Sequence, residues 1–213
     1  MKELKVKLTF FEEVLGTASA DPEIHAEFIA SKAPDAPSRE EEIASIGVEE
    51  AIGKAMTVFP RNKNGQPILY DYQIKGFFKN AAKAMYAIGG DSKLTSYKTK
   101  IDNLIFINER QILLQMPDGQ GIGNCQRPLR GQTAQGERIA LANSETCPAG
   151  TTIEFTIKIL LDSLQKNVIE WLDYGELNGI GQWHNSGKGR FTYKILNDAG
   201  EKIAGKRVTK NDD

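Results

Sequence analysis

Residues 67–82, PILYDYQIKGFFKNAA, change from an extended segment into a helix, and this change decides the fold class. From Gln73 to Ala87 the apolar residues recur at helical spacing, and Gly89-Gly90 follows as a helix-ending signal. Before this stretch, the sequence Asn62-Lys63-Asn64-Gly65 predicts a turn that leads into the extended residues 67–72. The stretch therefore predicts a helix that directly follows a strand-like segment.

Further elements are predicted on both sides of this stretch. Residues 4–10 alternate apolar and polar side chains, which predicts a half-buried strand. A second helix, capped by Ser163, is predicted over residues 163–174. Other strands are predicted at residues 56–60, 104–107, 111–116, 137–143, 151–161 and 190–196, with a last strand ending at Val208. We expect residues 104–107 to pair with 111–116, and 137–143 with 151–161. This order favours an α+β fold, an antiparallel sheet with helices on one face.

Charge is distributed unevenly along the chain. Residues 12–50 hold eleven acidic residues against Lys32 and Arg39, a local charge of −9, whereas the whole chain carries −1 and the remainder therefore +8. Prolines interrupt this region, so we expect short helices, one between Pro22 and Ser31 and one starting at the capping-box sequence from Ser38. We predict a single domain over residues 1–213, with 12–55 as an acidic, partly helical insertion after the first strand.

Composition bounds the class of protein. With 213 residues, 40% hydrophobic and 26% charged, the chain is typical of a water-soluble domain. No apolar run reaches the roughly 18 residues of a membrane span, and no signal-peptide stretch is visible, so we expect a cytoplasmic protein that does not contact membranes. Cys125 and Cys147 lie in unlike contexts, and Cys125 and His184 are too isolated to be metal ligands. We therefore predict no disulfide, no metal site and no cofactor.

The glycine-rich residues 175–190, GELNGIGQWHNSGKGR, carry the strongest functional signal. Five of the chain's 20 glycines lie here, beside a tryptophan, a histidine, a lysine and an arginine. Glycines let backbone amides approach a polyanion closely. Lys188 and Arg190 add positive charge, and Trp183 or His184 can stack on a base. A flexible surface loop with turn glycines is the alternative interpretation.

The start of the first helix is the second signal. Lys75 and Gly76 lie in its first turns, where free N–H groups can face an anion, and Lys75, Lys79 and Lys83 recur four apart. A plain amphipathic helix with a solvated lysine face is the alternative. Arg127, Arg130 and Arg138 lie in a glycine-interrupted strand region and are candidates for phosphate contacts, with ordinary surface arginines as the alternative.

Together these stretches resemble the RAMP superfamily, the repeat-associated RNA-binding proteins of CRISPR systems. QIKGFFK at residues 73–79 is similar to the Ser-x-Lys-Gly-like turn and helix of that family, with Gln73 in place of the usual serine. Residues 179–191 resemble its glycine-rich loop, and residues 147–155 resemble the turn and strand between the two. The likeness covers residues 56–196 in the family's order and is closest in texture to the single-domain backbone subunits of type I and type III effector complexes. It implies a ferredoxin-like, RNA-recognition-motif-like fold.

The resemblance also implies a function in antiviral defence. The expected partners are guide-like single-stranded RNA, other CRISPR effector subunits, and further copies of this chain, which would form a homo-oligomer along the RNA. The expected RNA-binding residues are Gln73, Lys75, Gly76, Lys79, Lys83, Arg127, Arg130, Gly179, Gly181, Trp183, His184, Gly187, Lys188, Gly189 and Arg190.

Two other functions remain open at this point. The acidic insertion also fits a phage-borne or stand-alone protein-interaction factor, a subunit mimic or inhibitor that occupies the basic nucleic-acid site of a CRISPR effector. A metal-independent endoribonuclease is the second alternative. His25 lies where processing enzymes of the superfamily keep a catalytic histidine, and Asp21 or Asp35 would correspond to the loop aspartate of type III backbone subunits. Surface residues explain all three more simply, so we assign no catalytic residue and favour a binding protein over an enzyme.

Overall fold

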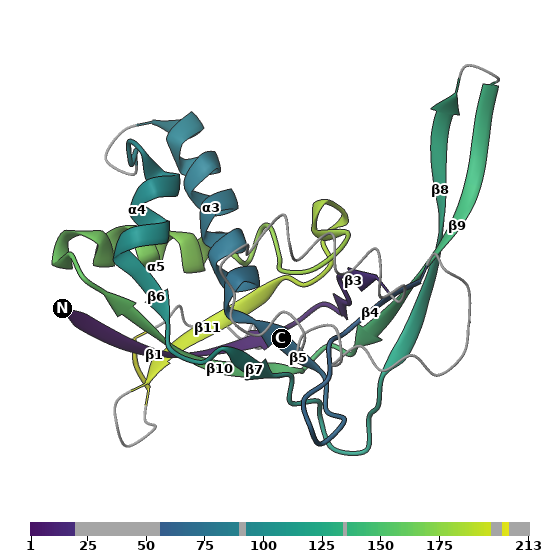
Figure 1. Ribbon diagram of the computed structural model, residues 1–213, viewed down its shortest axis with the longest axis horizontal. Coiled ribbons are helices and arrows are strands. Elements are labelled where there is room, and N and C mark those ends of the chain that lie inside the picture. Colours follow the sequence, from purple (N-terminus) through teal and green to yellow (C-terminus); the bar gives the residue numbers. More distant parts are fainter. Residues whose placement is uncertain (20–55, 90–92, 134–135, 197–201, 205–213) are drawn as a thin grey trace, which may run out of the picture.

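A five-stranded antiparallel sheet forms the centre of the computed structural model, which describes residues 1–19, 56–89, 93–133, 136–196 and 202–204 (Figure 1). Its strands are β1 (Lys2–Phe10), β6 (Ile105–Ile107), β10 (Thr152–Ile159), β11 (Phe191–Leu196) and β12 (Lys202–Ala204). They lie in the order β12-β11-β1-β10-β6, and all neighbours are antiparallel. The predicted α+β class with an antiparallel sheet is confirmed.

Three helices connect the strands of this sheet. After β1 the chain forms several short strands and then α3 (Asp71–Ile88) and α4 (Tyr97–Leu104), which lead into β6; α5 (Gln165–Tyr174) connects β10 to β11. Along the chain, the elements follow one another as strand, helix, strand, strand, helix, strand, and the strands lie in the order β11-β1-β10-β6. This is the succession found in ferredoxin-like folds. The three helices lie together on one face of the sheet (Figure 1).

The core lies between this sheet and the helices. Along β1 the side chains of Leu4, Val6, Leu8 and Phe10 are buried, as their alternation predicts. From the helices, Phe78 of α3 packs against Trp171 of α5, with ring centres 5.7 Å apart. Phe77 of α3 contacts Phe191, the first residue of β11, at 5.2 Å. This aromatic packing holds the first turns of α3 beside the residues that follow the glycine-rich stretch.

A second sheet extends away from the first. It contains β2 (Val14–Leu15), β3 (Ala18–Ser19), β4 (Met56–Val58), β8 (Gly123–Thr133) and β9 (Gly136–Cys147) in the order β2-β9-β4-β3, with β8 on β9. The β8–β9 hairpin projects from the body of the molecule (Figure 1). A small sheet pairs β5 (Ile68–Tyr70) with β7 (Gln111–Leu113).

Two predicted strand pairings are wrong. β9 pairs with β8 and β10 pairs with β1, so residues 137–143 and 151–161 belong to different sheets. Likewise β6 pairs with β10 and β7 with β5. A short turn brings consecutive strands close, but burial decides the partner. Ile153, Phe155 and Ile157 alternate inward along β10, and pairing with β1 is what places them over the core.

The helices also begin at residues other than those predicted. α3 starts at Asp71 rather than Gln73, and α5 starts at Gln165 after a 3-10 turn at Asp162–Leu164, without the predicted serine cap. α4 has no counterpart in the sequence-based prediction. The helices predicted after Pro22 and Ser38, and the end of the last strand beyond Ala204, lie outside the described residues. Among the helices of the described residues, none is long and apolar enough to cross a membrane.

Candidate functional site

The glycines of residues 175–190 serve close packing within the chain. A Cβ on Gly179 would lie 2.1 Å from the carbonyl carbon of Gly189, and one on Gly189 would lie 1.9 Å from the carbonyl oxygen of Ile180. Gly189 also has a φ of +68°, a conformation that other residues rarely adopt. Two passes of the loop backbone therefore lie against each other, at a distance that only glycine permits.

Hydrogen bonds tie this loop to the residues that follow β1. The N–H of Ile180 donates to Gly189 O at 3.0 Å, and the N–H of Gly189 donates to Glu13 O at 2.7 Å. The N–H of Gln182 donates to Leu15 O over a longer 3.4 Å. These three amides are occupied within the chain and are not free to bind an anion. The loop is accordingly a fixed support for its side chains.

The two cations of the loop are paired with carboxylates next to β1. Nζ of Lys188 lies 2.9 Å from Oε2 of Glu13, and Nη2 of Arg190 lies 3.0 Å from Oε1 of Glu12. The hydrogen bond to Glu13 raises the pKa of Lys188 above its ordinary value. The Arg190 guanidinium also lies 5.1 Å from the ring centre of Phe11, a half-exposed side chain. Ion pairs this exposed contribute about 0–1 kcal/mol, so a phosphate can replace the carboxylates at little cost.

Arg127 and Trp183 form the most tightly organised part of the site. Arg127, on β8, is only 5% exposed, and its guanidinium lies 5.0 Å from the ring centre of Trp183. It donates hydrogen bonds to Ser144 Oγ and to Gln182 Oε1, both at 2.9 Å. Trp183 itself is 38% exposed. The structure thus brings together two predicted residues that lie 56 positions apart in the sequence.

The predicted helix start has a structural role of its own. Gln73 closes the first turn of α3, because its Oε1 accepts the N–H of Tyr70 at 2.7 Å. Its Nε2 donates to Thr17 Oγ1 at 2.6 Å. Gly76, by contrast, is exposed, and a Cβ there would meet nothing within 4 Å. Its small size is therefore not needed for packing within the described part of the chain.

Two of the three lysines in the predicted stripe attach α3 to its neighbours. Nζ of Lys75 donates to Asp102 O at 3.3 Å and lies 4.7 Å from the ring centre of Phe106. Burial lowers the pKa of Lys75. Lys79 pairs with the Asp102 carboxylate at 2.6 Å, whereas Lys83 is exposed. Lys83 is thus the member of the stripe that is most open to a ligand.

Residues 11–19 connect the two predicted motifs. Leu15 O accepts the N–H of Gln182 in the glycine-rich loop, and two residues later Thr17 Oγ1 accepts the side-chain hydrogen bond of Gln73 in α3. Residues 14 and 15 also pair with β9. The helix start and the loop, more than 100 residues apart in sequence, therefore meet at one short segment.

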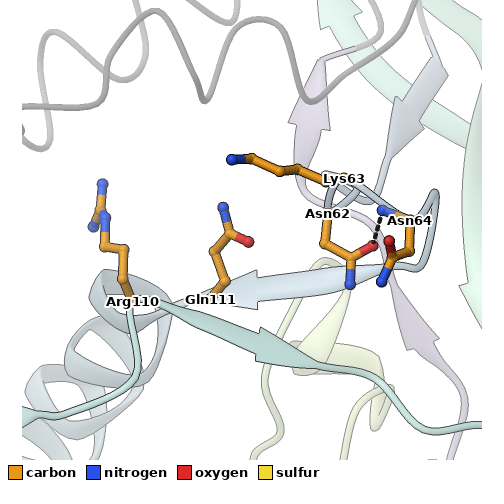
Figure 2. A pocket seen from close by; sticks show the side chains of 5 residues that line it. All are labelled: Asn62, Lys63, Asn64, Arg110 and Gln111. Atoms are coloured by element: carbon orange, nitrogen blue, oxygen red, sulfur yellow. Dashed lines mark hydrogen bonds between the residues drawn. The ribbon is translucent and has the colours of Figure 1, made fainter.

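A polar depression of about 480 Å³ lies beside α3, and sequence reasoning missed it. Figure 2 shows Asn62, Lys63 and Asn64 on one turn, facing Arg110 and Gln111 at the start of β7. Arg110 forms an ion pair with Asp71 and lies 5.0 Å from the ring centre of Tyr70. The turn was predicted from local sequence, but only the pairing of β5 with β7 places it opposite Arg110.

The remaining candidate residues are not brought together with the loop cations or the helix start by any described contact. His25, Asp21 and Asp35 lie outside the described residues. Arg130 and Arg138 are on β8 and β9, in the projecting hairpin. His184 Nδ1 lies 3.0 Å from Gly181 O. In the described part of the chain, no group of three or more histidine, cysteine or acidic residues is placed to hold a metal ion.

Comparison with known proteins supports the fold. No model of a protein family matches the chain, and no curated protein matches it in sequence. Its structure matches a chain in the cryo-EM structure of the type III-B Cmr-beta bound to cognate target RNA, with a TM-score of 0.53 and 9% identity. That match covers 92% of this chain but only 60% of the other, so this chain spans about three fifths of its length.

A chain of a type IV-B CRISPR complex aligns over 97% of this chain and 96% of its own length, with a TM-score of 0.46 and 9% identity. Both structures contain CRISPR effector subunits. At 9% identity, the match to the Cmr-beta chain shows a shared fold. The fold of this chain is thus one that also occurs in a subunit of a CRISPR effector complex.

Proposed function

We propose that this chain binds single-stranded RNA as a subunit of a CRISPR effector complex. The observation that carries the proposal is the meeting of the helix start and the glycine-rich loop on residues 11–19, through Gln73–Thr17 and Gln182–Leu15. A second support is the fold shared with a chain from a complex bound to cognate target RNA. Under this proposal, the two stretches that resemble RAMP motifs together form the RNA-binding surface.

On this surface, RNA would contact the side chains that the fold leaves accessible. The loop supplies Trp183 and the cations Lys188 and Arg190, and α3 supplies Gly76 and Lys83. Phosphates would replace Glu12 and Glu13 on the two loop cations, because each pair is partly exposed and weak. Gly76, the sixth residue of α3, has open space where a Cβ would lie and would let a ribose or phosphate approach the backbone of the second turn of the helix.

Assembly along the RNA is part of the same proposal. An acidic segment on one copy and a basic body on the next would form a heterologous contact, which repeats until a partner caps it. Such a contact weakens as salt rises. Light scattering is expected to show oligomers that grow when RNA is added and shrink at high salt. A monomer under all these conditions would overturn the proposed assembly along RNA. It would not affect RNA binding by a single copy, which the anisotropy experiment tests.

Fluorescence anisotropy with a labelled single-stranded RNA of about 20 nucleotides tests the binding itself, over a salt series from about 50 to 300 mM. Wild-type protein is expected to bind in the micromolar range or tighter, with affinity that falls as salt rises. Each phosphate contact to single-stranded RNA adds about 0.7 to the slope of log K against log salt. The double variant Lys188→Gln/Arg190→Gln is therefore expected to lower that slope by about 1.4.

Lys7→Gln provides the matched control. Lys7 pairs with Glu154 at the same 2.9 Å as Lys188 with Glu13, but it lies on the face of β1 that points away from the core. Its loss is expected to leave the slope nearly unchanged. Absence of any RNA affinity at about 50 mM salt would overturn the proposed function. Capture of a CRISPR effector by a protein without RNA affinity would instead support an interaction factor.

A further inference from the structure

Trp183 adopts a backbone conformation that its side chain does not favour. Its φ is 59° and its ψ is 24°, in the left-handed region. Among the described residues, Ser96 is the one other non-glycine residue with positive φ. Left-handed backbone is uncommon for a bulky residue and persists only where the surroundings impose it. Glycine or asparagine would occupy this position with less strain.

Core packing does not explain why a tryptophan is kept there. Trp171, the other tryptophan of the chain, is fully buried, whereas Trp183 is 38% exposed. The strained backbone therefore leaves part of a large aromatic ring open to solvent. Strain of this kind is concentrated at binding and catalytic sites, where it sets the direction of a side chain.

Arg127 holds the indole from within the protein. The guanidinium lies 5.0 Å from the ring centre, and its hydrogen bonds to Ser144 and Gln182 fix its orientation from β9 and from the residue before Trp183. Its Nε is buried and has no partner among the described residues. Among the described residues its partners are neutral oxygens and the indole, and no described carboxylate pairs with the buried positive charge. The charge therefore adds to the positive potential around the ring.

We propose that Trp183, supported by Arg127, is a stacking platform for a base of single-stranded RNA. The inference rests on the proposed function and names how the loop binds its ligand. Every base has a π-face, so stacking on an indole tolerates any sequence and contributes strongly to affinity. Lys188 and Arg190 follow in the same loop and would hold the phosphates on either side of the stacked base. Arg127 is a positioning residue, which acts on the RNA through Trp183.

The test compares two ligands that differ only in their bases. One is a short oligouridine, and the other is the abasic ribose-phosphate oligomer of equal length, which keeps the phosphates. Oligouridine is expected to quench the fluorescence of Trp183, because a stacked base lies against the ring. Trp171 is buried and serves as an internal reference. The abasic oligomer is expected to bind more weakly and to quench little.

Trp183→Gly tests whether base stacking on Trp183 contributes to RNA affinity while the fold is kept. Glycine adopts positive φ without strain, but loss of the indole removes what compensates the buried Arg127 charge, so the variant is expected to fold and to melt below the wild-type temperature, and binding is measured well below that temperature. Its affinity for oligouridine is expected to fall about 5- to 150-fold, with an unchanged salt slope, because stacking involves no ion release. Its affinity for the abasic oligomer is expected to equal that of wild type. Leu177→Gly, at an exposed apolar residue of the same loop, is the control and is expected to leave oligouridine affinity unchanged.

Arg127→Lys tests whether Arg127 positions the Trp183 ring for stacking. The lysine keeps the charge but loses the two-pronged hydrogen bonding, so oligouridine affinity and quenching are expected to fall together while abasic binding is retained. Equal oligouridine affinity in wild type and Trp183→Gly would overturn the platform and leave the proposed function standing. Absence of binding to both oligomers in the wild type would overturn both.

Discussion

Glu13 binds the glycine-rich loop twice, through its carboxylate on Lys188 Nζ at 2.9 Å and through its carbonyl oxygen on the N–H of Gly189 at 2.7 Å. The backbone contact keeps the carboxylate beside the lysine even though both side chains are partly exposed. Glu12 binds the loop once, through its carboxylate on Arg190 Nη2 at 3.0 Å. Both cations of the loop are thus neutralised within the chain before any ligand arrives.

Removing these carboxylates is expected to strengthen RNA binding. Glu12→Gln/Glu13→Gln leaves the two cations free. Because each exposed pair is worth about 0–1 kcal/mol, RNA affinity should rise several-fold at low salt, and this increase should shrink as salt rises. Fluorescence anisotropy with labelled RNA measures this change in affinity. Glu154→Gln, which frees Lys7 from a pair of equal length, is the matched control. An equal gain in binding free energy per carboxylate removed, in both variants, would mean that only net charge matters.

Gln73→Ala is expected to lower the stability of the fold. The side chain caps α3 through Tyr70 and joins it to Thr17, so its loss removes two hydrogen bonds at 2.7 and 2.6 Å. Loss of a helix cap reduces the free energy of unfolding by about 0.5–2 kcal/mol. Urea denaturation followed by circular dichroism measures the change. Gln120→Ala, at an exposed residue, should shift the midpoint little, and an identical shift would contradict the capping role.

Two glycine substitutions are expected to have opposite effects. Gly76→Ala adds a methyl group in open space within α3 and should raise the free energy of unfolding by about 0.8–1 kcal/mol, because alanine has the higher helix propensity. Gly189→Ala places a Cβ 1.9 Å from Ile180 O at positive φ and should lower it by more than about 1–2 kcal/mol. Denaturant midpoints of the two variants provide the comparison.

RNA binding by the same Gly76→Ala variant tests the helix start. Under the proposed function, the added methyl group stands where RNA approaches the helix, so affinity should fall although the fold is more stable. Unchanged affinity in this variant would show that RNA does not approach α3 at Gly76.

The two cysteines are expected to differ in reactivity. Cys147 is fully buried, and burial raises the pKa of its thiol to about 12. At about pH 8 only Cys125, which is partly exposed, should react with a thiol reagent in the native protein. Cys125→Ser should abolish the native reaction and Cys147→Ser should leave it intact. Two fast-reacting thiols in the native wild type would contradict the burial of Cys147.

The same pKa sets a direction for stability against pH. A thiol whose pKa is raised on folding favours the folded state fully below its ordinary value of 9.0, and this contribution is lost as the pH rises towards about 12. Wild type is therefore expected to lose stability above about pH 9 more steeply than Cys147→Ala, as measured by urea midpoints at increasing pH. Parallel curves for the two proteins would contradict the shift.

Local pattern alone was enough to predict the elements that build the first sheet. Alternation in residues 4–10 and the helical spacing that ends at Gly89 report directly which side chains are buried, because backbone geometry sets periods of 2 and 3.6 residues. The α+β class followed from their order. The candidate status of Trp183, Lys188 and Arg190 was likewise visible in their clustering among glycines.

Pairing and partners were decided only in three dimensions. β10 joins β1 instead of β9 because its apolar face must cover the core, a long-range effect that no turn sequence encodes. In the same way, Glu12 and Glu13 meet Arg190 and Lys188 across more than 170 residues, and Arg127 reaches Trp183 only because β8 lies beside the loop. The sequence by itself determined which residues are candidates for RNA binding; the tertiary structure decided which of them are already paired, because charge and ring contacts depend on distances in space.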